Sequence, residues 1–259
     1  MKSFTAIALE SFPLIRQGDD IARIIIETAR KNNLQIEEGD IVAVAQKIFS
    51  KAENRIISLK DVLPSRRSEE IAVVTGKNAE FVELVLRETE RIVKASPEVL
   101  LVEDTRNLIC VNAGIDKSNV EGKDNFTLLP ENPDISARKC RLKIKKLTGK
   151  NAGVIICDTY SRPFRRGQVN FAIGIAGIKP FKDYRGKGDL FGQILRVKNI
   201  SIVDEIAAAA ELLMGQGEEA TPVVIFKGLD EWVLSENHDD FEIADLIISL
   251  DEDLFKDAL

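Results

Sequence analysis

Histidine, tryptophan, tyrosine and cysteine are all scarce in this sequence, and each shortage excludes a kind of site. The 259 residues include one histidine, one tryptophan, two tyrosines and three cysteines. The histidine, His238, stands in an acidic segment, so catalysis by a histidine base is not expected. Cys110, Cys140 and Cys157 are odd in number and widely spaced, which fits neither a CxxC zinc site nor a disulfide framework. Any chemistry should therefore depend on carboxylates, metal ions, lysines and arginines, in a reducing cytoplasm.

Long apolar runs and an excess of positive charge are also missing. No apolar run approaches the ~20 residues that a membrane-spanning helix needs, and the N-terminus lacks the pattern of a secretory signal. The net charge of −6 argues against nucleic-acid binding, which normally requires a basic surface. Neither of the glycine-rich nucleotide-binding motifs, GxxxxGK[ST] and GxGxxG, occurs between a predicted strand and a predicted helix. A nucleotide would have to be held in some other way, and neither nucleic acid nor a membrane is an expected partner.

The composition is that of a folded protein with a sizeable core, since 44% of the residues are hydrophobic and 30% are charged. Strand-like runs and amphipathic helix patterns are mixed without strict βαβ alternation, which favours an α+β fold with mixed sheets and packed helices. No repeat or linker divides the chain, so residues 1–259 are expected to form one unit, with two subdomains as an alternative. The expected strands are 4–8, 41–45, 99–102, 108–111, 154–157, 169–175 and 221–226. Expected helices start near 20, 65 and 78 and cover 134–147, 204–214 and the acidic tail from 235.

The central stretch, residues 153–177, carries the strongest chemical signal. The apolar run 154–157 predicts a buried strand, with Asp158 and Thr159 at its end and a basic loop at 162–167. Carboxylate and hydroxyl oxygens suit hard divalent cations, and arginine forks match phosphate or carboxylate. The alternative is that Asp158 and Thr159 only begin a turn and the arginines are solvated.

Polar groups follow other predicted strands in the same way. Asp116 and Asn119 come after the strand at 108–111, where a simple Asx turn is the alternative. Because Asp158 occupies a similar position, the two aspartates can converge on one divalent ion. Lys47 and Lys51 follow the strand at 41–45 and could meet phosphates, although solvated surface lysines are commoner.

Six segments, in this order and spacing, resemble the coenzyme F420-0:L-glutamate ligase family, the gamma-glutamyl ligases of the deazaflavin coenzyme F420. They are FPLI, SKAENR, VNAGIDKSNV, GVIICDTYSRPFRRG, FAIGIAG and DEIAAAAELLMGQG, and they cover residues 12 to about 228. The resemblance implies a GTP-dependent ligase that adds L-glutamate to the lactyl carboxylate of F420-0 and then extends a polyglutamate tail. It also implies an unusual α+β fold that works as an intertwined homodimer.

The resemblance also implies roles for particular residues. The metal ligands, for two Mg²⁺ or Mn²⁺ ions with K⁺ as a further possible ion, would be Asp116, Asp158, Thr159 and Gln216. Asp116, Asp158 and Lys51 would be the catalytic groups, and we expect the acidic substrate or the incoming glutamate to meet Arg162, Arg165 and Arg166. The GTP site would comprise Phe12, Pro13, Leu14, Ile15, Gln46, Lys47, Lys51, Asn119, Met214, Gly215, Gln216, Gly217, Glu218, Glu219, Ala220 and Thr221.

Two departures from the family pattern bear on this interpretation. Gln46 and Lys47 replace small hydroxyl residues that some members carry, and Gln216 stands where an acid can occur. An amide ligand lowers the negative charge around a cation, which affects metal affinity and preference. Two other functions use the same residues: a metal-dependent phosphohydrolase, and a non-catalytic protein that binds GTP or a deazaflavin.

Overall fold

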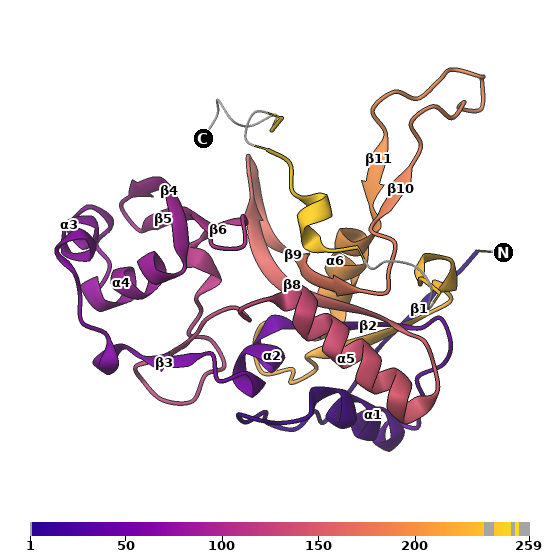
Figure 1. The fold of residues 1–259 in the computed structure, drawn as a ribbon, viewed down its shortest axis with the longest axis horizontal. Coiled ribbons are helices and arrows are strands. Elements are labelled where there is room, and N and C mark those ends of the chain that lie inside the picture. The colour runs from indigo at the N-terminus through magenta and orange to yellow at the C-terminus, as the bar shows by residue number, and fades with distance from the viewer. Residues whose placement is uncertain (1, 236–240, 250–251, 254–259) are drawn as a thin grey trace.

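A five-stranded mixed sheet forms the centre of the molecule (Figure 1). The computed structural model describes residues 2–235, 241–249 and 252–253. Neighbouring strands are antiparallel except β2 and β8, which are parallel. In sheet order the strands are β1 (Thr5–Ala8), β12 (Val223–Lys227), β2 (Ile41–Ala45), β8 (Gly153–Arg162) and β9 (Arg165–Ala176). The expected α+β class with mixed sheets is confirmed.

Both faces of this sheet are covered, which explains why its inner strands are apolar throughout. Alternate side chains of a strand point to opposite faces. Val42 and Val44 are buried in one core with α1 and α5, whereas Ile41 and Ala43 are buried in a second core with α6. The helices are α1 (Ile21–Lys31), α5 (Pro133–Thr148) and α6 (Ile202–Met214).

The helix ends follow the capping signals of the sequence. Asp20 caps α1 by accepting a hydrogen bond from the Arg23 N–H at 3.1 Å. Ser65 and Asn78 cap α3 and α4 in the same way, and Gly149 ends α5 in the left-handed conformation. These predicted starts and ends are confirmed.

A smaller lobe, residues 56–128, has its own sheet and core (Figure 1). Its strands β4, β5 and β6 are antiparallel in that order, and helix α4 packs on one face with α3 beside it. The predicted hairpin of β5 and β6 is confirmed, but β4 was not predicted. The lobe elements are α3 (Arg66–Thr75), α4 (Ala79–Arg87), β4 (Thr89–Ser96), β5 (Val99–Asp104) and β6 (Ile109–Val111). Helix α2 (Gln46–Ala52) and the pair β3 (Ile56–Ser58) and β7 (Asn125–Thr127) connect it to the body.

The hairpin of β8 and β9 corrects the prediction for the central stretch. Strand β8 continues five residues beyond Cys157, so Asp158 and Thr159 lie inside a long strand and not at its end. The predicted basic loop is a tight hairpin end, in which only Pro163 and Phe164 separate the two strands. The end of this hairpin, residues 161–168, is mostly polar and exposed, so its sequence lacks the apolar run that marked the inner half.

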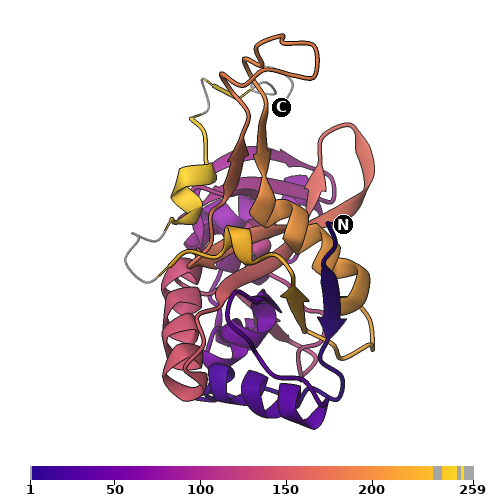
Figure 2. The ribbon, with the colours of Figure 1, turned by 90° about the vertical axis from the view of Figure 1, so that its right-hand side faces the viewer.

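The second half of the chain contains two further departures. An arm that starts with the short pair β10 (Phe181–Asp183) and β11 (Asn199–Ser201) projects from the body (Figure 2).

The tail has one short 3-10 turn, Ile243–Leu246, within the described residues, and its Phe241 and Ile248 are exposed. The predicted tail helix is therefore wrong over 241–249; the rest of that prediction falls on 236–240, 250–251 and 254–259, which lie outside the described residues. None of the described helices is both long and apolar enough to cross a bilayer.

Candidate functional site

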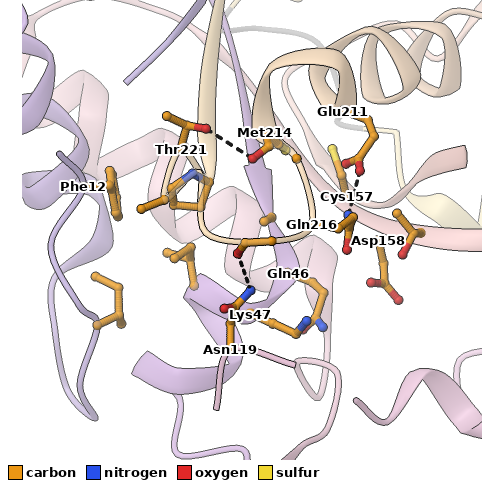
Figure 3. A pocket seen from close by; sticks show the side chains of 18 of the residues that line it. Phe12, Gln46, Lys47, Asn119, Cys157, Asp158, Glu211, Met214, Gln216 and Thr221 are labelled. Carbon is orange, nitrogen blue, oxygen red and sulfur yellow. Dashed lines mark hydrogen bonds between the residues drawn. The ribbon is translucent and has the colours of Figure 1, made fainter. Parts of the chain in front are cut away.

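A cavity of about 350 Å³ opens at the carboxyl end of β2, beside the middle of β8 (Figure 3). Ala45 of β2 is paired with Cys157 of β8. The residues that follow this pair, Gln46 and Asp158, therefore begin side by side. The loop after α6 and the segment before α1 complete the wall. Of the residues predicted for the GTP site, all except Glu219 line this cavity, although they come from four distant parts of the sequence.

The loop that closes the cavity, residues 214–221, is held by its own hydrogen bonds. The Thr221 hydroxyl donates to the Leu213 carbonyl at 2.8 Å. The Glu219 carboxylate accepts from the Gly217 N–H at 2.8 Å and lies against Gly215. A Cβ at Gly215 would come within 2.3 Å of the Glu219 carboxyl carbon, and φ at Gly215 is +64°, so a side chain there would displace Glu219 and strain the backbone. Glu219 therefore stabilises the loop through its backbone contact and is not among the residues that line the cavity.

Two lysines on α2 face this cavity one helical turn apart. The Lys51 ammonium donates to the Asn119 carbonyl at 2.8 Å, and the Asn119 side-chain amide donates to the Gly217 carbonyl at 3.2 Å. Burial, and after it the charge of Lys47, lowers the pKa of Lys51. Asn119 thus links the lobe to α2 and to the closing loop. The two lysine ammonium groups beside it give this part of the cavity a positive charge, which suits an anionic ligand.

Gln46, next to these lysines, holds a donor without a partner. Its side chain is 2% exposed, and its carbonyl accepts from the Ser50 hydroxyl at 2.6 Å. The Nε2 atom is buried and, among the described residues, has no hydrogen-bond partner. A buried unpaired donor is costly, so a ligand oxygen in the cavity would satisfy it.

The two predicted metal-binding aspartates have opposite electrostatic environments. Burial alone would raise the pKa of Asp116, but the Lys47 ammonium at 2.5 Å and the Ser118 N–H at 2.8 Å bring that pKa below its ordinary value. Burial raises the pKa of Asp158 to about 7, with smaller increases from the negative charges of Asp116 and Glu211. At neutral pH, Asp116 is ionised and Asp158 is near its midpoint.

A second cavity, of about 420 Å³, adjoins the first. Asp158, Thr159 and Gln216 line both cavities, whereas Asp116 lines only the second. The four predicted metal ligands therefore gather at the wall between the two spaces. This convergence was predicted from the sequence; that it divides two cavities was not.

The donor set at this wall fits a hard divalent cation. It consists of two carboxylates, one hydroxyl and one amide oxygen, which are ligand types that Mg²⁺ and Mn²⁺ accept. In the part of the chain that the structure describes, no three His, Cys, Asp or Glu side chains cluster as a metal site. Because all four donors are oxygen atoms, they fit a magnesium-type ion better than zinc, for which nitrogen and sulfur are common ligands.

Glu211, in the last turn of α6, was missed by the sequence analysis. It lines the first cavity, and its Oε1 atom accepts a hydrogen bond from the Gln216 amide at 2.8 Å (Figure 3). With the amide N–H₂ bound to Glu211, the Gln216 carbonyl oxygen can face the wall. Burial raises the pKa of Glu211. The only feature of the sequence that could have indicated Glu211 is its position as an acidic residue near the end of an alanine-rich helix.

The three arginines predicted to bind substrate lie on the outer part of the β8–β9 hairpin. Within the described residues, none of Arg162, Arg165 and Arg166 lines either cavity. The Arg162 guanidinium donates to the carbonyls of Arg166 and Gly167 at 3.4 and 3.5 Å. The structure thus separates them from the wall that gathers the other predicted residues.

Comparison with known proteins identifies the family. The model of the F420-0:gamma-glutamyl ligase family matches residues 10–228. The chain belongs to this family. A protein from Archaeoglobus fulgidus is 48% identical over 222 residues, covering 86% of each chain. A protein from Methanopyrus kandleri is 43% identical over 232 residues, covering 88% of this chain and 90% of its own. Both relatives are named coenzyme F420:L-glutamate ligase. The residues matched by the family model include both cavities and the wall between them.

Proposed function

We propose that this chain is a GTP-dependent ligase that joins L-glutamate to the lactyl carboxylate of coenzyme F420-0, with further gamma-glutamyl additions. The observation that carries the proposal is the first cavity. It gathers four distant segments around two lysines and an unpaired Gln46 donor, and Asp158 lines it at the wall that it shares with the second cavity. Family membership and the names of the relatives point to the same substrates.

The proposed chemistry has two steps. An oxygen of the acceptor carboxylate attacks the γ-phosphorus of GTP, the bond from that phosphorus to the bridging oxygen breaks, and GDP leaves. The glutamate amine then attacks the carbonyl carbon of the acyl phosphate, and inorganic phosphate leaves as the amide forms and the amine loses its proton. In this proposal Lys47 and Lys51, which line the cavity, would hold phosphate oxygens, and the unpaired Gln46 Nε2 would donate to the nucleotide.

Asp116, Asp158, Thr159 and Gln216 would hold the divalent ions, Mg²⁺ or Mn²⁺. When bound, such ions neutralise negative charge on the phosphates during transfer. In this structure the Lys47 ammonium supplies the positive charge beside the Asp116 carboxylate. A cation at Asp116 would take over that role and free the ammonium for the nucleotide.

We further propose that the chain acts as a homodimer through its projecting arm. The arm exposes the large apolar side chains of Leu190 and Phe191 at its tip and of Val197 near its base, each at least 89% exposed. Apolar side chains concentrated on a protruding segment are typical of an interaction surface. Sedimentation should give a dimer, and replacing all three with serine should give monomers.

A product mass spectrum tests the proposed ligase. The protein is incubated with F420-0, GTP, glutamate and either Mg²⁺ or Mn²⁺, with Asp116→Ala and Asp158→Ala as controls. The expected result is mass steps of one glutamyl residue that require GTP and vanish in both variants. GTP hydrolysis with unchanged F420-0 would instead support the phosphohydrolase. Tight GTP binding with neither product nor hydrolysis would support the non-catalytic binding protein.

A further inference from the structure

The second cavity lies between the small lobe and the β8–β9 hairpin. Strands β5 and β6 of the lobe supply one side, and residues 158–161 with Gln168 of the hairpin supply the other. Among the residues that the structure describes, Asp158, Thr159 and Gln216 are the ones that line both this cavity and the first cavity. Cavities between two structural units are common ligand sites.

Part of the lobe side of this cavity is apolar and partly exposed. Ile109 and Val111 point the same way from β6 and are 37% and 40% exposed, while Cys110 between them is 3% exposed and turned to the other face. Leu101 on β5 is paired with Val111 and lines the same cavity. Leu101, Ile109 and Val111 thus form a small apolar floor inside a cavity whose other lining residues are mainly polar, and an apolar ligand surface would gain from burial there.

Charge in the second cavity is confined to one end. Its charged lining residues, among those the structure describes, are Asp116 and Asp158, and no lysine or arginine lines it. Free glutamate carries two carboxylates and an ammonium, and a nucleoside triphosphate carries more negative charge still. Either would need cationic partners, which this floor lacks.

We infer that the second cavity binds the body of the acceptor, a large and mostly uncharged ring system, with its carboxylate at the shared wall. This inference depends on the proposed ligase function and assigns to the acceptor a site distinct from that of GTP. The acceptor carboxylate and the γ-phosphate then approach Asp158, Thr159 and Gln216 from opposite sides. Phosphoryl transfer across that wall needs no movement of either ligand between cavities.

Steady-state kinetics of an Ile109→Ser/Val111→Ser double variant test the inference. Both side chains are partly exposed, so the fold should tolerate the change. We expect the KM for F420-0 to rise about tenfold or more, because one methylene in an apolar pocket already changes selectivity by about tenfold. The KM values for GTP and glutamate should stay within about twofold of wild type.

The matched control is Val99→Ser, since Val99 is also 37% exposed on the lobe sheet but does not line the cavity. It should leave all three KM values unchanged. An unchanged KM for F420-0 in the double variant would overturn the inference, and so would an equal rise in the KM for GTP. If wild-type protein forms no product, the proposed function fails instead. Isothermal titration of F420-0 into wild type and the double variant then tests the site itself, and equal affinities would overturn the inference.

Discussion

Asp158→Asn should stabilise the metal-free protein while abolishing its activity. Burial raises the pKa of Asp158 from its ordinary value of 3.8 to about 7. Each pKa unit corresponds to about 1.4 kcal/mol, so the ionised carboxylate costs up to about 4 kcal/mol of folding free energy. Because the carboxyl borders two cavities whose solvent screens its charge, we expect about half of this, roughly 2 kcal/mol. Asparagine has a similar shape without the charge.

The pH dependence of this effect has a definite sign. Between pH 4 and 7 the unfolded chain has lost the Asp158 proton while the native protein still holds it, so this group lowers stability as pH rises. The advantage of asparagine should therefore grow from about pH 4 and become constant above pH 7. Thermal unfolding in chelator at pH 8 should show a Tm about 5 °C above wild type. Equal Tm values at pH 8, or an advantage that shrinks as pH rises, would refute the reasoning.

Three further predictions concern the same site and its support. Metal affinity, measured by titration, should weaken about tenfold from pH 8 to 6, because Asp158 with a pKa of about 7 must release its proton; a flat profile would contradict this. Glu211→Ala should weaken metal binding about tenfold or more by releasing the Gln216 amide, with the nucleotide KM little changed. Gly174→Ala should cost about 2–3 kcal/mol in urea unfolding because its Cβ would lie 2.5 Å from Pro133, whereas Gly188→Ala, which meets only ordinary contacts, should be neutral.

Local signals in the sequence were sufficient for most of the fold. Capping residues such as Asp20 and Asn78 act within one helical turn, so they fixed the helix starts correctly. Strand β4 was missed because its pairing with β5 has two register irregularities that break the alternation of side chains. The end of the β8–β9 hairpin, residues 161–168, was missed because it is mostly polar and exposed.

The sequence predicted many of the residues that line the two cavities, but not Glu211 and not the arrangement of the cavities. The two aspartates were expected to converge, and the structure brings them near enough for Asp116 to raise the pKa of Asp158. The role of Glu211 depends on a loop that returns Gln216 to the helix end. The second cavity depends on the hairpin that faces β6. Both are long-range tertiary relations, which no local pattern in the sequence encodes.

The most direct test of the central claim follows oxygen from the acceptor carboxylate. F420-0 labelled with ¹⁸O in its lactyl carboxylate is incubated with the protein, GTP, glutamate and Mg²⁺, and the released phosphate is analysed by mass spectrometry. Transfer across the shared wall through an acyl phosphate predicts one ¹⁸O atom in each inorganic phosphate formed with product. Glutamylated product accompanied by unlabelled phosphate would contradict the account.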